Sequence, residues 1–346
     1  MDRGRIAIRA GGRQICIAGK VIAPAGSAPD TIIDIGAGEI HPGLINAHDH
    51  LHRNHYGRLG HPPYEDARQW GQDIQQRFRC EIAAGKEVPR REALLTGAWK
   101  NLFSGVTRVV HHDHWEKDFE DAFPIKVVRI GLIEDAHECE PDVSLADARV
   151  RSVHLAEGTS ERARSELAQR KACGLLDARL LAVHCVGLDD AMIAELHASG
   201  AAVIWCPSSN LYLLGQTVRP ELLAAGDVLL GSDSLLSGAG NLLDEIALAR
   251  QIGYLPDDRL IEAVGSLAAK RLGIPPPDLA SGRAADVIVL AKPLLECSAE
   301  DVVLVLVDGV PRIALPEIAP AFEALGYRGE TRTLDGVTRW TYSGVD

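Results

Sequence analysis

The stretch Pro42-Gly-Leu-Ile-Asn-Ala-His48-Asp49-His50 carries two histidines, two residues apart, at the end of a short apolar run. On an extended chain the side chains alternate with a period of two, so residues i and i+2 point to the same side. The imidazoles of His48 and His50 can therefore reach one metal ion. The run before them is expected to be a buried strand whose C-terminal end carries chemistry.

The same pattern returns further along the chain. His154 and Glu157 end one apolar run, His184 ends the next, and Asp233 ends a later one. From residue 152 such runs alternate with segments that begin at good helix N-cap residues and stop at glycine. This rhythm predicts parallel strands covered on both faces by helices. We therefore expect an α/β fold, a (β/α) barrel with its active groups at the C-terminal ends of the strands.

The two ends of the chain predict a second, smaller unit. Residues 1–40 contain short strand-like runs separated by glycine and proline, too few for a core of their own. Apolar runs at 285–290 and 302–307, with the turn Asp308-Gly309, predict a hairpin outside the barrel. We expect residues 1–40 and 280–320 to form a composite small β-domain and residues 41–279 to form the barrel. The polar residues after 320 give no prediction.

Composition excludes several classes of protein. The chain has 346 residues, 46% of them hydrophobic, which suits a large core. A net charge of -12 argues against nucleic acid as a partner. No apolar run has the form of a signal peptide or the length of a membrane span, so a cytoplasmic protein without a membrane partner is expected. We expect a small-molecule substrate, and a homo-oligomer remains open.

The cysteines agree with a reducing compartment. Seven cysteines are present, an odd number, and none shows C-x-x-C spacing. This pattern predicts neither a disulfide framework nor a structural zinc site. Most of the cysteines are expected to be buried small hydrophobic side chains.

Four of the strand-end residues predict a metal site. A catalytic zinc needs about three protein ligands and a coordination position left for water. His48, His50 and His154 can supply neutral nitrogens. Asp233 can supply a carboxylate, and beside a metal-bound water the same carboxylate can also act as the base.

Two further residues predict proton-handling groups. Glu157 follows His154 by three residues, so the two face opposite ways on a regular strand. A bend before Gly158 would aim both inward, and Glu157 would then be a proton shuttle and a substrate anchor. His184 could be a fourth nitrogen ligand or a donor to a developing oxyanion.

The candidate substrate contacts lie next to these strand ends. The polar stretch 52–70 is a candidate active-site loop that carries Tyr56 and Arg58. His112 and His114 follow the strand-like run 105–110, and we expect them to touch substrate and not the metal. Asn210 ends Cys206-Pro-Ser-Ser-Asn210 and is a further candidate contact.

Taken together, these motifs resemble the amidohydrolase superfamily. The resemblance is strongest to its branch of guanine and cytosine deaminases, S-adenosylhomocysteine deaminases and triazine chlorohydrolases. The motifs cover about residues 38 to 290 in the family's order. They are Pro-Gly-Leu-Ile-Asn-Ala-His-Asp-His (42–50), Gly-Val-Thr-Arg-Val-Val (105–110), His-Leu-Ala-Glu (154–157), Val-His (183–184), Cys-Pro-Ser-Ser-Asn (206–210), Gly-Ser-Asp-Ser (231–234) and Gly-Arg-Ala-Ala-Asp-Val-Ile-Val-Leu (282–290).

The resemblance implies a distorted (β/α)8 TIM barrel with a small β-sandwich built from both termini. It implies one divalent metal, zinc with iron as the alternative, and a deamination that releases ammonia from a nitrogen heterocycle. In this branch the histidine at the position of His184 binds substrate or the attacking oxygen, and the glutamate at the position of Glu157 moves protons. The metal ligands implied are His48, His50, His154 and Asp233.

The chain departs from the family in length. Only 40 residues separate Asp113 from His154, and they hold one clear strand at 125–133. A parallel crossover needs about a dozen connecting residues, so two full βα units would be cramped. The sequence leaves open whether one barrel strand is missing here. Lys126 lies at the wrong end of its strand and Lys100 in a helix, so neither is placed to bridge two metals, and we expect a mononuclear site.

Two other functions remain open at this point. The same metal site could hydrolyse a cyclic amide, an imidazolone-like ring or a carbon–halogen bond. A non-enzymatic metal-binding scaffold is the other alternative, and the complete ligand set argues against it. The sequence does not name the substrate.

Overall fold

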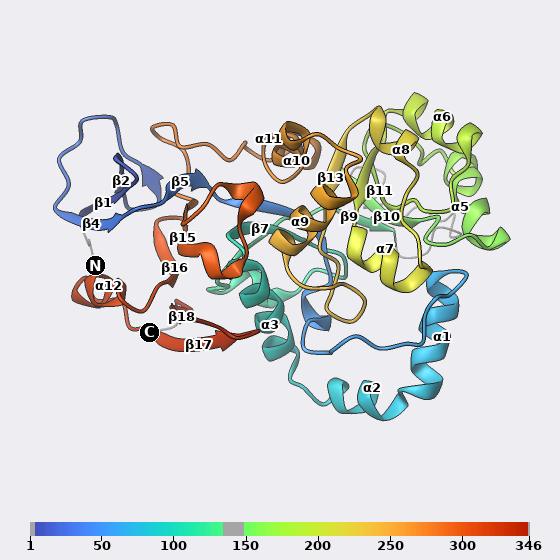
Figure 1. Ribbon diagram of the computed structural model, residues 1–346, viewed down its shortest axis with the longest axis horizontal. Coiled ribbons are helices and arrows are strands. Elements are labelled where there is room, and N and C mark those ends of the chain that lie inside the picture. The colour runs from blue at the N-terminus through green and yellow to red at the C-terminus, as the bar shows by residue number, and fades with distance from the viewer. Residues whose placement is uncertain (1–3, 134–148, 345–346) are drawn as a thin grey trace.

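Two parallel sheets form the central part of the molecule, which a computed structural model describes for residues 4–133 and 149–344. Within these residues no continuous ladder joins the two sheets into a closed barrel. The predicted α/β fold with parallel strands is present, and it departs from a closed barrel in this way (Figure 1). In ladder order, one sheet contains β6 (Leu44–Asp49), β7 (Val106–His111) and β8 (Lys126–Val127), and the other β13 (Val228–Leu230), β12 (Ala202–Trp205), β11 (Leu180–His184), β10 (Arg151–Leu155) and β9 (Gly131–Ile133).

Hydrogen bonds connect β6, an edge strand of one parallel sheet, to the segment that follows β13, an edge strand of the other. The Ser232 N–H donates to Asn46 Oδ1 at 3.1 Å, and the Asp233 N–H donates to the His48 carbonyl at 3.1 Å. At Gly231 an added Cβ would lie 2.6 Å from the His48 Cβ, so only glycine allows this approach. We call this contact of residues 46–48 with 231–233 the seam.

The single strand expected at 125–133 is two short strands that serve different sheets. β8 pairs with β7, and β9 pairs with β10. The Val128 N–H still donates to Val109 O at 2.8 Å, whereas the Gly131 N–H donates to Val150 O at 2.9 Å. Among the described residues this run alone spans the space between β7 and β10. Residues 134–148, which follow it, lie outside the described part of the chain.

Helices follow the strands as the sequence rhythm predicts. The Asp189 carboxylate accepts the Met192 N–H at 3.0 Å at the start of one helix, which ends at Gly200 with φ 75°. No helix in the described residues is long and apolar enough to cross a membrane. The helices are α1 (Ala67–Arg77), α2 (Arg79–Lys86), α3 (Arg90–Leu102), α5 (Glu161–Ala172), α6 (Asp190–Ser199), α7 (Pro207–Leu214), α8 (Pro220–Ala224), α9 (Leu242–Ile252), α10 (Asp257–Ala263) and α11 (Ser266–Leu272), with 3-10 turns η1 (Leu51–Arg53) and η2 (Lys117–Glu120).

Both termini lie at the same end of the molecule, in two antiparallel-rich sheets (Figure 1). The first contains β3 (Val21–Ile22), β2 (Arg13–Ala18), β1 (Arg5–Ala10) and β4 (Thr31–Gly36). The second contains β17 (Glu330–Leu334), β18 (Val337–Thr341), β16 (Val310–Ala314), β15 (Val302–Val307), β14 (Val287–Leu290) and β5 (Glu39–Pro42), flanked by η3 (Leu294–Glu296), η4 (Ala299–Asp301) and α12 (Ala319–Ala324).

The pairing of β5 with β14 joins the two ends of the chain in one sheet. Asp308 and Gly309, with φ 50° and 72°, form the two-residue turn between β15 and β16, as the sequence suggests. β17 and β18 extend this sheet beyond residue 320, in a segment for which no strand was predicted. The division into a small β-sandwich and a barrel at the predicted boundaries stays a prediction.

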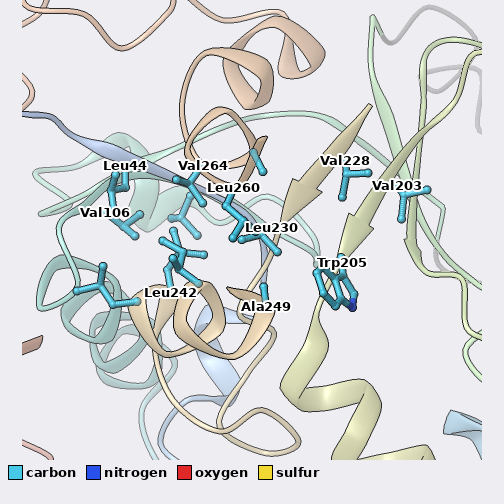
Figure 2. Close-up of a cluster of buried hydrophobic side chains, with 14 of the residues drawn as sticks. Leu44, Val106, Val203, Trp205, Val228, Leu230, Leu242, Ala249, Leu260 and Val264 are labelled. Carbon is cyan, nitrogen blue, oxygen red and sulfur yellow. The ribbon is translucent and has the colours of Figure 1, made fainter. Parts of the chain in front are cut away.

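A buried apolar cluster fixes β13 against its neighbours (Figure 2). Leu230 of β13 lies among Leu242 and Ala249 of α9 and Leu260 of α10, and all four are at most 1% exposed. Burial of this kind contributes roughly 1.5–3 kcal/mol for each large side chain. The cluster therefore holds the end of β13, and with it Asp233, in place.

The cysteines agree only in part with the expectation that most of them are buried. Cys185, Cys206 and Cys297 are buried free thiols, and Cys80 is exposed. Cys173 is disulfide-bonded. A disulfide at Cys173 does not agree with the expected reducing compartment.

Candidate active site

A cavity of about 510 Å³ opens where the C-terminal ends of the parallel strands meet. The strand-end residues predicted from the sequence converge on it although they come from four separate segments. This is the position at which barrel enzymes place their catalytic groups. Its lining includes His50, His112, His154, Glu157, His184 and Asp233.

The four predicted metal ligands lie close together, and His50, His154 and Asp233 line this cavity. His50 Nε2 is 3.3 Å from His154 Nε2, which is the separation, about 3.3–3.4 Å, of two nitrogens bound to one tetrahedral zinc. Asp233 Oδ1 is 3.8 Å from His50 Nε2 and 3.9 Å from His48 Nε2. Both ring nitrogens of the fully buried His48 lack a hydrogen-bond partner among the described residues. A donor set of this kind fits a divalent metal.

The histidines of the cluster are neutral, as metal ligands must be. Burial is the largest cause that lowers the pKa of each ring, and the charges of neighbouring histidines and of Arg53 add to it. Their nitrogen lone pairs are therefore available without the loss of a proton. The rings whose pKa is held well below 6.5 are those of His48, His50, His112 and His154.

A bend after β10 brings Glu157 to the same side as His154. Ala156 has φ 48°, a left-handed conformation, and Glu157 Oε1 then lies 3.5 Å from His184 Nε2. Asn210 Oδ1, 2.8 Å from His184 Nδ1, can only accept, so the ring proton lies on Nδ1 and Nε2 keeps its lone pair. Burial raises the pKa of Glu157 well above its usual value, and the charge of Asp233 raises it further. Glu157 is therefore suited to hold a proton at neutral pH.

Asp233 is held in a strained conformation by hydroxyl groups. Its φ of 51° is left-handed, and Oδ2 accepts from Ser209 Oγ at 2.7 Å and from Ser237 Oγ at 2.9 Å. Burial alone would raise the pKa of Asp233, but the nearby His184 and the hydrogen bond from the Ser209 hydroxyl outweigh it, so this pKa is lowered. The remaining oxygen, Oδ1, faces His48 and His50 as an anion.

Comparisons with known proteins agree with this geometry. No family model matches the chain. A 5-methylthioadenosine/S-adenosylhomocysteine deaminase of Moorella thermoacetica is 28% identical over 90% of this chain and 87% of its own length. An adenosine deaminase structure from Xanthomonas campestris with bound zinc superposes with a TM-score of 0.69, at 19% identity over 93% of this chain and 97% of that one. A triazine hydrolase variant superposes with a TM-score of 0.70, at 18% identity over 93% and 99%.

The chain resembles the deaminases of the amidohydrolase superfamily along nearly its whole sequence, and it has their fold. The resemblance seen in the sequence motifs and the expected barrel fold are thereby confirmed. The chain spans 87% of the length of the deaminase relative from Moorella, so the similarity is not confined to the strand-end motifs.

His112 lies closer to the predicted metal ligands than the sequence suggested. Its ring centroid is 4.2 Å from that of His154 and 5.0 Å from that of His48. Its Nδ1 is 3.2 Å from Ser152 Oγ, and its buried Nε2 has no partner among the described residues. His112 can therefore offer Nε2 either to substrate or to the metal.

A second group, His52, His111 and Asp113, resembles a metal site but cannot be one. The Leu51 N–H donates to His111 Nδ1 at 3.1 Å, so the proton of the neutral ring must lie on Nε2. Burial lowers the pKa of His111 to about 3, which keeps the ring neutral. Nε2 is then a donor without a free lone pair, and one of the three ligands is lost.

Lys100 of α3 is buried behind the site and binds the backbone of Asp233. Its Nζ donates to the Asp233 carbonyl at 2.7 Å and to Ser232 Oγ at 3.0 Å, and it lies 3.0 Å from Asp49 Oδ2. The lysine is 2% exposed, and Asn101 also donates to Asp49, at 2.6 Å. Lys100 is therefore committed to a buried ion pair. It is not free to bridge two metals, as the sequence predicted for a different reason.

Glu245 of α9 anchors the helix that carries Ser209 and Asn210. The Ser208 N–H donates to its Oε2 at 3.0 Å, and the Ser208 hydroxyl donates to its Oε1. Burial raises the pKa of Glu245 from 4.5 to about 7. The folded protein therefore binds this proton more tightly than the unfolded chain does. Stability from this group is complete below pH 4.5 and declines as the pH rises towards 7.

We expect the Glu245→Gln variant to lack this decline. The difference in unfolding free energy, wild type minus variant, should fall by about 3 kcal/mol between pH 4.5 and pH 8. Urea unfolding at a series of pH values measures it. Glu262→Gln, at an exposed position of α10, is the matched control and should leave the pH dependence unchanged. A difference that stays constant with pH would refute the assignment.

The predicted substrate contacts are only partly at the cavity. His112 and His114 line it. The Tyr56 hydroxyl instead donates to Ile82 O at 3.3 Å, and Arg58 donates to Gly238 O at 2.8 Å, so both are engaged away from the lining. Asn210 is 1% exposed and orients His184 from behind.

Other lining residues were not singled out from the sequence. Arg53, Arg68 and Trp70 all face the cavity. They belong to the polar stretch 52–70, which the sequence marked as a candidate active-site loop without identifying which side chains turn inward. Their direction depends on how η1 and α1 pack, and no local motif encodes it.

Proposed function

We propose that this amidohydrolase removes an amino group from a nitrogen heterocycle and releases ammonia. The observation that carries the proposal is the Glu157 carboxyl group, 3.5 Å from His184 and in the same cavity as the predicted metal ligands. Deamination needs an acid at the ring nitrogen while water is added to the neighbouring carbon. The similarity to a 5-methylthioadenosine/S-adenosylhomocysteine deaminase supports this choice.

The residues proposed to hold the divalent metal are His48, His50, His154 and Asp233. Three neutral nitrogens and one carboxylate are a donor set that suits zinc. The zinc bound to the adenosine deaminase of Xanthomonas campestris supports the same choice. Bound here, the metal would lower the pKa of a water towards about 7.

Asp233 and Glu157 each carry out one of the proton transfers that deamination needs. Asp233 Oδ1 is anionic and accepts the proton of the attacking water. Glu157 delivers its proton to the ring nitrogen, and the amino group leaves as ammonia once it has gained a proton. His184 Nε2 accepts a hydrogen bond from the water or from Glu157, because its Nδ1 proton is committed to Asn210.

Ammonia release is the direct test. We expect the zinc-loaded protein to release one ammonia for each ring consumed from at least one member of a panel of aminopurines, aminopyrimidines and aminotriazines. Ammonia is measured by an enzyme-coupled assay and the ring by chromatography. Chloride release from chlorotriazines is followed in parallel. The proposal would be contradicted if the heterocycle were consumed with release of chloride and not of ammonia. It would also be contradicted if a protein that holds its metal released no ammonia from any compound of the panel.

A further inference from the structure

Two arginines line the cavity without a partner. Arg53 follows the His50 strand end in η1, and Arg68 lies in the first turn of α1. Within residues 4–133 and 149–344, neither guanidinium group has a hydrogen bond or an ion pair. The other arginines near this opening are paired. Arg90 contacts Glu116, Arg77 lies 2.9 Å from Asp73, and Arg58 binds the Gly238 carbonyl.

The negative groups of the same lining are already engaged. Asp113 lies 3.2 Å from His52 Nε2 and 3.9 Å from Arg90. Asp233 accepts two serine hydroxyls and faces the predicted metal ligands. Glu157 faces His184. The two guanidinium groups of this lining therefore make no direct ion pair among the described residues, although the charge of Arg53 lowers the pKa of both Glu157 and Asp113. A bound divalent metal would add further positive charge.

A guanidinium group that lines a substrate cavity without a direct partner is available to bind an anion; Arg53 is half-buried there and Arg68 is exposed. Arginine presents a planar set of N–H donors that matches a carboxylate or a phosphate with two parallel hydrogen bonds. The cavity volume of about 510 Å³ is within the usual range for small-molecule sites and leaves room for a substituent beyond a heterocyclic ring. Trp70, which lies in α1 two residues after Arg68, supplies an aromatic surface in the same lining.

We propose that the substrate carries an anionic group, a carboxylate or a phosphate, and that Arg53 and Arg68 bind it while the amino-bearing ring faces the strand ends. This inference rests on the proposed function for the position of the ring. It assigns Arg53 and Arg68 to substrate selection. Neither is given a part in the proton transfers.

The test compares an anion with its neutral analogue. Adenosine-5′-carboxylate, adenosine 5′-monophosphate and the neutral adenosine-5′-carboxamide are titrated into zinc-loaded protein by calorimetry. We expect at least one of the two anions to bind at least about tenfold more tightly than the carboxamide. Whichever anion is preferred identifies the group. Ammonia release from the same compounds is measured in parallel.

Arg53→Met is the decisive variant. It should weaken binding of the preferred anion by about 10- to 100-fold and change binding of the carboxamide less than about twofold. Arg68→Met should have a smaller effect in the same direction, because Arg68 is exposed. Arg77→Met, on the same helix but with its side chain paired to Asp73, is the matched control and should change neither.

The outcomes separate this inference from the proposed function. Equal binding of the anions and the carboxamide, including no measurable binding of any of them, overturns it. A preference for the anion that survives in Arg53→Met also overturns it, because the metal would then be the ligand of the anion. Ammonia from the carboxamide with no preference for the anions would leave the deaminase intact and remove only the anion site. If the anions bound more tightly through Arg53 but no compound released ammonia, the anion site would stand and the proposed deaminase function would be contradicted.

Discussion

Replacement of Asp233 by asparagine is expected to lower kcat by at least about 10⁴-fold while the protein keeps its fold. General base catalysis alone contributes about 10²–10⁴-fold, and this variant also removes the negative charge from the metal-binding set. The fold should survive because asparagine fills the same space. The Ser209 and Ser237 hydroxyls can rotate to accept from the new amide group.

The measurement is single-turnover ammonia release on the best substrate of the panel, with metal content determined by mass spectrometry and fold by thermal unfolding. Asp258→Asn, at an exposed position of α10, is the matched control and should retain normal turnover. If Asp233→Asn turned over within tenfold of the wild type, Asp233 would be neither base nor ligand.

The Glu157→Gln variant is expected to lose about 10²–10⁴-fold in kcat and to keep its metal. Glutamine has the size of glutamate but cannot deliver a proton to the ring nitrogen. Metal should remain because the proposed ligands come from the other strand ends and His184 still closes that side of the cavity. Metal content and kcat are measured on the same preparation.

A glutamate on the neighbouring helix provides the control for this variant. Glu161 is exposed in the first turn of α5, so Glu161→Gln should behave as the wild type. Loss of metal from Glu157→Gln would make Glu157 a ligand, and normal turnover would remove it from the mechanism. Both results differ from the expected loss of rate at full metal content.

The sequence predicted the strand ends well because the information there is local. A buried parallel strand is a short apolar run, and a polar residue that ends the run lies at the edge where the active site forms. His48, His50, His154 and Asp233 could be found in this way. The bend at Ala156 could be anticipated from the spacing of His154 and Glu157 and from Gly158.

The supporting residues could not be found in this way, because they arrive through packing between distant segments. Lys100 reaches Asp49 and Asp233 only after α3 has packed against the strand ends. Glu245 reaches Ser208 from α9. Neither residue stands in a motif, and a charged residue in a helix is usually solvated. The burial that gives both residues their roles is set by the tertiary structure.

Which strands pair with one another could not be predicted from the local sequence either. The run 125–133 looks like one strand, and only the positions of β7 and β10 show that its two halves pair with different neighbours. The strands β17 and β18 were missed because polar residues occupy both faces of β17. Such a strand lacks the alternation that marks a half-buried sheet.

The seam has a consequence for the order of folding. It joins residues 46–48 to residues 231–233, so it closes a loop of most of the barrel and its formation carries a large entropic cost. The proposed ligands lie on both sides of it, His48 and His50 on one and Asp233 on the other. A metal would therefore find its full set of ligands only after the seam has formed. Its binding would then stabilise the folded protein and slow unfolding.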